Sequence, residues 1–373
     1  MSSRLEFCIF LIWDKISSAH FHILWNRSPL LEVVPSRAIR QGDPLSPYLF
    51  ILCLERLSIK LNEAVCDKLI HPIHFRTGVH LLHLFFADDI FFFTRAIARD
   101  YKNLSRLLLD FYESSDQLMS ATKSKTWFSP CTPRHIKEQV AGILGLPTTD
   151  RIGTYIGTPI FTTSWTTSSY QYLVDNIRKR IEGWQAKYLS MAGRATFIKA
   201  SITLVPIYAM KTALLPQKIC HHIDTLSCHF LWGNTDHHRG CHTINWETVT
   251  LPKEAGGLGI SSTRHRNQAI LMSQAWRLYS DPTSLWARVL QAKYFPHATV
   301  FTIPWTARRS HILTALSLGA ELLLEGMRWI VGDGRTIRIW KDHWLPNGSL
   351  RTYIEGPLLP QEEDREVNSL WSN

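Results

Sequence analysis

The chain has 373 residues and is 45% hydrophobic, which is enough apolar material for one or two buried cores. Its 41 lysine and arginine residues exceed its 31 aspartate and glutamate residues. The formal charge of +10 favours a polyanionic partner, with a merely solvated basic surface as the alternative. Seven cysteines without paired spacing predict no disulfide framework, and no segment predicts a secretion signal or a membrane span. We therefore expect an intracellular protein, nuclear or cytoplasmic, with no membrane partner.

A loop followed by a helix is the first informative segment. Residues 40–47 read Arg-Gln-Gly-Asp-Pro-Leu-Ser-Pro, and the glycine and two prolines predict a loop. Ser46 is a predicted N-cap, and Pro47 suits the first helical turn. Apolar residues then recur every four positions, which predicts one buried helix face. This face comprises Leu49, Cys53, Leu57, Leu61 and Val65.

Two adjacent carboxylates interrupt the next apolar run. Residues 84–93 read Leu-Phe-Phe-Ala-Asp-Asp-Ile-Phe-Phe-Phe, with Asp88 and Asp89 in the middle. Burying two unpaired charges inside a strand is costly, so we expect both at the tip of a hairpin. Carboxylate oxygens there suit Mg²⁺ and metal-assisted phosphoryl transfer. The alternative is an ordinary Asp-Asp pair at a surface turn.

Helices dominate the rest of the chain. An amphipathic helix is predicted from about Asp100 to Met119, and a strand over Lys125–Ser129. A further helix should begin after Pro133 and end at Gly145. Trp276 and Trp286 are predicted core anchors, followed by a short β segment near Trp329–Trp344. Successive helices are expected over residues 165–191, 194–210 and 217–232, and from about 264 onward.

The order of loop, helix and Asp-Asp hairpin resembles the polymerase palm of reverse transcriptases from plant non-LTR (LINE-type) retrotransposons. Two core motifs of that family correspond to Arg40–Phe50 and Phe86–Asp89. Further segments that resemble the family are Ser115–Ser124, Tyr155–Pro159, Gly193–Lys199, Phe230–Gly233 and Gly256–Ile260.

The resemblance implies an α+β fold in three parts. Residues 1–160 would form a partial palm, an antiparallel sheet with packed helices that lacks the first catalytic strand. Residues 161–260 would form a thumb-like helical region. Residues 261–373 would form a helical C-terminal extension, truncated before a zinc-binding or ribonuclease H region.

The resemblance also implies roles for single residues. Asp88 and Asp89 would be the catalytic residues and the Mg²⁺ ligands of an incomplete two-metal site. Arg40, Gln41 and Gly42 would bind the nucleotide and template, although Arg40 is equally explained as a solvated loop residue. The implied partners are an RNA template, a DNA primer and deoxynucleoside triphosphates.

Three more residues complete the implied site. Lys123 would lie near the triphosphate and protonate the leaving group, with a plain surface lysine as the alternative. Tyr155 and Gly157 would shape the primer grip, although a buried tyrosine at a strand turn explains them nearly as well.

The chain departs from the family pattern at several positions. The first catalytic aspartate belongs to an earlier palm strand, and Asp14 is a poor substitute for it. Ala38 and Asp116 stand where the family has glycine, and Ser120 where it has asparagine. We therefore expect an impaired RNA-directed DNA polymerase. The alternatives are a non-catalytic nucleic-acid-binding protein and a non-functional retrotransposon remnant.

A cluster of cysteine and histidine residues offers a separate metal hypothesis. Their types suit zinc, but adjacent residues direct their side chains apart, so we do not assign a zinc site. The cluster comprises Cys228, His229, His237, His238, Cys241 and His242.

Overall fold

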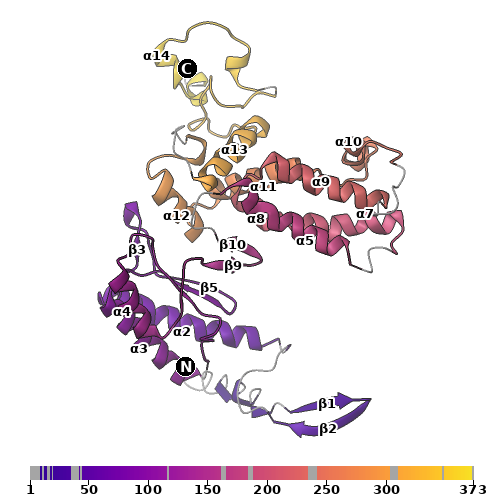
Figure 1. Ribbon diagram of the computed structural model, residues 1–373. Coiled ribbons are helices and arrows are strands. Elements are labelled where there is room, and N and C mark those ends of the chain that lie inside the picture. The colour runs from indigo at the N-terminus through magenta and orange to yellow at the C-terminus, as the bar shows by residue number, and fades with distance from the viewer. Residues whose placement is uncertain are drawn as a thin grey trace. The chain divides into compact units, whose positions relative to one another are not determined.

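The computed structural model divides the chain into two compact units, Met1–Gly153 and Thr154–Asn373 (Figure 1). The structure describes residues 9–10, 12–14, 17–18, 20–34, 42, 44–115, 117–160, 165–183, 188–233, 242–302, 310–346 and 348–371. Short two-stranded sheets accompany the helices, so the fold is α+β. Among the described residues, no helix is both long and apolar enough to cross a membrane.

The first unit combines helices with paired short strands. Three strand pairs are antiparallel (β1–β2, β3–β4 and β5–β6), whereas β7 and β8 pair in parallel. The elements are β1 (Phe21–Trp25), β2 (Ser28–Val33), α2 (Ser46–Cys66), β3 (Ile73–His74), β4 (His80–Leu81), β5 (His83–Phe86), β6 (Asp89–Phe92), α3 (Ala98–Ser115), β7 (Thr126–Trp127), α4 (Arg134–Leu144) and β8 (Thr148–Thr149).

Helices α2 and α3 supply most of the core of this unit. The predicted face of α2 is confirmed, since Leu57 and Leu61 are fully buried. The N-cap of α2 is Leu45 rather than the predicted Ser46, so that prediction is wrong by one residue. Helix α3 ends at Ser115, earlier than predicted, where the Ser115 hydroxyl donates to the Phe111 carbonyl oxygen (2.7 Å). Such a side-chain bond competes with continuation of the helix.

Both predicted ends of α4 are confirmed. Pro133 precedes the first residue, and Gly145 follows the last in a left-handed conformation (φ 65°). Glycine adopts this conformation without steric cost, so it stops the helix and lets the chain turn toward β8.

The second unit is mainly helical. A β-hairpin of β9 (Gly153–Tyr155) and β10 (Thr158–Ile160) lies at the boundary between the units. The helices are α5 (Gln171–Ile181), α7 (Met191–Ala200), α8 (Ile207–Thr212), α9 (Gln217–Trp232), α10 (Trp246–Val249), α11 (Thr263–Ser280), α12 (Leu285–Tyr294), α13 (His311–Gly326) and α14 (Pro360–Glu363).

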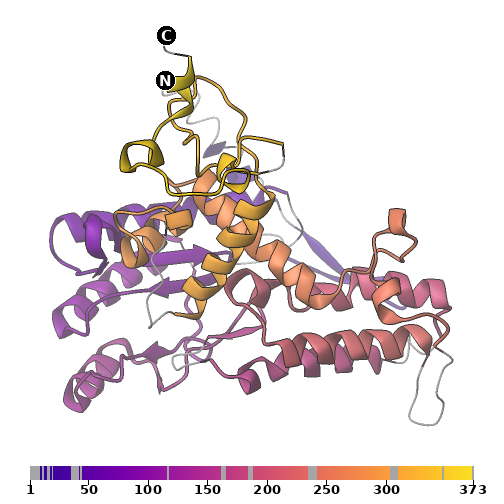
Figure 2. The same cartoon turned by 90° about the horizontal axis from the view of Figure 1, so that it is seen from above.

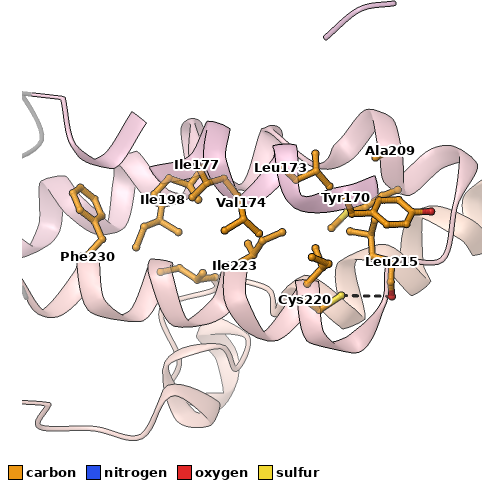
Figure 3. Packing of buried hydrophobic residues seen from close by; sticks show 14 of the residues in the cluster. Tyr170, Leu173, Val174, Ile177, Ile198, Ala209, Leu215, Cys220, Ile223 and Phe230 are labelled. Carbon is orange, nitrogen blue, oxygen red and sulfur yellow. Dashed lines mark hydrogen bonds between the residues drawn. The ribbon is translucent and has the colours of Figure 1, made fainter. Parts of the chain in front are cut away.

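The largest core of the molecule lies between α5, α7 and α9, which run side by side (Figures 1 and 2). Aliphatic side chains from the three helices interdigitate there, including Val174, Ile198 and Ile223 (Figure 3). Cys220 lies at one end of this core, and burial raises the pKa of its thiol to about 11. The thiol is 3.9 Å from the Leu215 carbonyl oxygen, so it behaves as a small apolar side chain.

Helix α11 belongs to two cores at once. It packs against α8 and α9 on one side and against α13 on the other. The contact with α13 is close because Gly319 lies there, and a Cβ at this position would be 2.4 Å from the Leu271 carbonyl oxygen. Only glycine permits such a backbone approach.

Several sequence predictions fail in this unit, including the helix expected over residues 165–191, since α5 ends at Ile181. Trp276 is 47% exposed and is not a core anchor, because the buried stripe of α11 passes through its neighbour Ala275 instead. Trp286 does pack partly buried against the core formed with α12 and α13. The described part of the segment Trp329–Trp344 contains no strand. Arg338 instead forms an isolated bridge with Glu366.

Candidate functional site: the Asp88–Asp89 hairpin

Strands β5 and β6 place the two aspartates at a hairpin tip. The strands pair from His83 with Phe92 at the base to Phe86 with Asp89 at the tip. Ala87 and Asp88 form the two-residue turn between them, and both carboxylates are exposed. The predicted position of the Asp-Asp pair is therefore confirmed.

One face of this hairpin packs on helices. Phe85, Ile90 and Phe92 lie against the core that α2 and α3 build with the buried Leu82. Phe86 on the opposite face is 59% exposed. This alternation follows the two-residue period of a strand, and it anchors the hairpin while leaving its tip in solvent.

The turn carries backbone strain. Ala87 has φ 49°, in the left-handed region that costs a side-chain-bearing residue about 1–2 kcal/mol. The cross-strand pairs on either side hold the turn in this conformation.

The donor atoms at the tip suit a hard divalent cation. Two neighbouring carboxylates repel each other, and a bound Mg²⁺ or Mn²⁺ would relieve that repulsion. In the part of the chain that the structure describes, no group of three or more His, Cys, Asp or Glu side chains has metal-binding geometry. Among the described residues, the tip therefore offers a cation two neighbouring carboxylates and no third side chain in metal-binding geometry.

Two hydrogen-bonded pairs fix the base of the hairpin, and neither was anticipated from the sequence. His83 Nε2 lies 2.9 Å from the Ser58 hydroxyl on α2. The fully buried Asp100 carboxylate accepts from the His71 backbone N–H (3.0 Å) and lies 3.1 Å from His71 Nδ1. The sequence signal that could have indicated such a pair is a polar residue inside an apolar run, as His83 is.

Of the other predicted site residues of the first unit, Gly42 and Lys123 lie on separate turns. Gly42 has φ 91° and is exposed, whereas Arg40 and Gln41 lie outside the described residues. Lys123 is exposed in a turn of the first unit, where its backbone N–H donates to the Ser120 carbonyl oxygen (3.2 Å). The structure thus joins Asp88 and Asp89 at one hairpin tip and places Lys123 on a separate turn.

Tyr155 and Gly157 belong to the β9–β10 hairpin. Ile156 and Gly157 form its turn, with φ 49° and 72°. The Tyr155 ring packs edge-on against Tyr208 of α8, with ring centroids 6.4 Å apart. The role of this hairpin as a primer grip stays a prediction.

The cysteine and histidine cluster is only partly described. Cys228 Sγ lies 3.9 Å from His242 Nδ1, and the Trp232 ring stacks on His242 at 5.8 Å. His237, His238 and Cys241 lie outside the described residues. The described members therefore form an aromatic and thiol contact at the end of α9.

Comparisons with known proteins give a family match that includes the residues of the hairpin. Residues 10–177 match the family described as reverse transcriptase (RNA-dependent DNA polymerase). A protein of Arabidopsis thaliana named for ribonuclease H is 35% identical over 53% of this chain and 33% of its own length. An uncharacterised mitochondrial protein of the same plant is 30% identical over 42% of this chain and 97% of its own length.

A further relative, with lower identity, is named as a transposon protein. A 149 kDa transposon protein of Xenopus laevis is 24% identical over 74% of this chain and 21% of its own length. The chain thus spans about a third of the length of the protein named for ribonuclease H and nearly all of the length of the mitochondrial protein. It belongs to the reverse transcriptase family.

Proposed function

We propose that this chain carries part of the palm of an RNA-directed DNA polymerase and that Asp88 and Asp89 are its catalytic carboxylates. The observation that carries the proposal is the hairpin itself. It is anchored on one apolar face and presents two exposed carboxylates at a strained turn. Hard oxygen ligands at a rigid tip are what nucleotidyl transfer needs.

The proposed substrates follow from the family. They are an RNA template, a DNA primer and deoxynucleoside triphosphates. When bound, Mg²⁺ would lower the pKa of the primer 3′-hydroxyl and neutralise charge on the phosphates. Asp88 would be the main ligand and Asp89 the weaker one.

Other residues would position the substrates. Arg40, Gln41 and Gly42 would contact the nucleotide and template, and Lys123 would protonate the leaving pyrophosphate. Tyr155 and Gly157 would support the primer. We further assign residues 161–260 to a thumb and residues 261–373 to a C-terminal extension.

We expect weak turnover by this chain alone. Two exposed carboxylates compete with water for a divalent cation and hold it less tightly than a larger set of ligands. Because family members use three carboxylates for two ions, we propose that the chain retains the ancestral site in impaired form.

The test is primer extension on poly(rA) annealed to oligo(dT), with dTTP and Mg²⁺ or Mn²⁺. We expect slow extension that Asp88→Asn lowers by at least about a hundredfold, because removing a metal ligand removes charge stabilisation in the transition state. Asp110→Asn is the matched control, since Asp110 is an exposed aspartate on α3 of the same unit. Extension that Asp88→Asn leaves unchanged would contradict the proposal.

A second candidate is nucleic-acid binding without catalysis. Arg178 and Lys179 are exposed in the last turn of α5. On α11, Trp276 and Tyr279 are 47% and 38% exposed, with ring centroids 5.8 Å apart. Cationic side chains bind phosphates, and exposed aromatic rings stack on bases.

The two candidates differ in what they require. Anisotropy of labelled single-stranded RNA, measured over a salt series, should show salt-sensitive binding that Asp88→Asn leaves intact. Binding without extension in the same preparation would favour the second candidate.

A further inference from the structure

His83 lies at the base of the Asp88–Asp89 hairpin, where strand β5 meets helix α2. Its Nε2 atom is 2.9 Å from the Ser58 hydroxyl, and its ring packs on Phe85 with centroids 4.6 Å apart. Across the hairpin its register partner is Phe92, which belongs to the core with α2 and α3. The hydrogen bond therefore joins the hairpin to α2 inside an otherwise apolar contact.

The second ring nitrogen of His83, Nδ1, is buried. It makes no hydrogen bond to any of the residues that the structure describes. A neutral ring tolerates this if Nε2 carries the proton and donates to Ser58, because Nδ1 is then only a bare acceptor. A protonated ring places an N–H group at Nδ1 with nothing to receive it. Leaving a donor unsatisfied in a buried position is costly.

The surroundings also oppose a positive charge. Burial lowers the pKa of His83, and the nearby Glu55 carboxylate of α2 offsets this effect only in part. On the paired strand, the residues near the base are apolar, from Ile90 to Phe93. The geometry and the direction of the pKa shift thus agree that the docked hairpin favours a neutral ring.

We propose that neutral His83, bonded to Ser58, is the positioning residue that docks the Asp88–Asp89 hairpin on α2, and that its protonation releases the hairpin. The consequence for catalysis rests on the proposed function of the tip. The docking itself does not, since it concerns only β5, β6 and α2.

The direction of the pH dependence follows from linkage. The docked state has the lower His83 pKa, so the released state binds more protons below the unperturbed value of about 6.5. Docking is therefore complete above that pH and weakens as the pH falls. One linked proton changes the opening equilibrium by at most about tenfold per pH unit.

Hydrogen–deuterium exchange of the full chain tests the proposal. Protection of the amides in β5 and β6 is compared at pH 7.5 and 5.5, after correction for the intrinsic exchange rate. We expect protection to fall between these pH values by up to about tenfold. His83→Gln should abolish this fall, because glutamine can bond to Ser58 without titrating.

Two variants complete the design. His80→Gln removes an exposed histidine on β4 and should keep the wild-type fall. Ser58→Ala should lower protection already at pH 7.5, because His83 loses its partner. A wild-type chain with pH-independent protection would overturn the proposal, as would a fall that persists in His83→Gln.

NMR titration of ¹³C-labelled histidine provides a readout that does not depend on the variants. We expect the His83 resonance to titrate below the ordinary histidine value of about 6.5, and titration at or above that value would overturn the proposal. Neither measurement involves primer extension. An inactive Asp88–Asp89 tip would therefore refute the proposed function and leave the docking of the hairpin to be judged separately.

Discussion

The first unit contains two hairpins of similar length with opposite surroundings. In β1–β2 nearly every described side chain is exposed, including Leu31 at 90% and Trp25 at 67%. In β5–β6 one face packs on α2 and α3, and two partly buried hydrogen-bonded pairs hold the base. An ion pair beside β1–β2, between His20 and Glu32 (2.6 Å), lies at the surface.

This difference shows that strand pairing alone does not position a functional group. An isolated two-stranded hairpin is marginally stable in water and needs a packed face. The β5–β6 hairpin has such a face, and it can therefore hold Asp88 and Asp89 in a fixed place.

The largest expected effect comes from the core beneath β5–β6. Leu57→Ala on α2 removes a fully buried side chain, and we expect it to destabilise the first unit by about 2–5 kcal/mol. Urea denaturation of the full chain measures the loss of stability. Amide hydrogen exchange in β5 and β6 serves as the local probe. The matched control is Leu31→Ala on β2, which should change stability by less than about 0.5 kcal/mol. Equal losses of stability in Leu57→Ala and Leu31→Ala would contradict the difference in packing between the two hairpins.

A smaller effect is expected at the base of the hairpin. Asp100 holds His71, whose carbonyl oxygen accepts from the Arg95 backbone N–H (3.2 Å) just beyond β6. Asp100→Ala leaves the His71 N–H without its buried partner and should cost about 1–3 kcal/mol. Thermal unfolding would measure this, with Asp110→Ala on the exposed face of α3 as the control. An unchanged melting temperature in Asp100→Ala would show that the Asp100–His71 pair does not contribute to stability.

The smallest expected effect concerns the two turns. Ala87 in β5–β6 and Arg27 in β1–β2 have φ 49° and 68°. Replacing either by glycine relieves steric strain but adds freedom to the unfolded chain, so we expect a gain of less than about 1 kcal/mol. Ala87→Gly should raise protection near the tip, whereas Arg27→Gly should leave the rest of the unit unchanged. Amide exchange distinguishes the two, and loss of stability in Ala87→Gly would mean that the turn is not strained.

Features with a local physical cause were predictable from the sequence. Two aspartates in an apolar run must lie where solvent reaches them, which placed Asp88 and Asp89 at a turn. Proline before a helix and glycine after it fixed both ends of α4. In each case neighbouring residues decide the outcome.

Features that depend on distant partners were not predictable. The exposure of Trp276 depends on which stripe of α11 meets α13, and helical spacing alone does not specify this. The bond between Ser58 and His83 joins residues 25 positions apart. A polar residue in an apolar run indicates that a partner exists, but it does not identify that partner.

The glycine at position 319 has a consequence for how the second unit unfolds. Because α13 meets α11 backbone to backbone there, and α11 also packs on α8 and α9, neither core can come apart without disturbing their shared helix. We expect the two cores to melt as one cooperative block rather than as separate folding units. A bulky side chain at position 319 would push α13 away from α11. We expect it to destabilise the core around Ile198 as well as the core between α11 and α13.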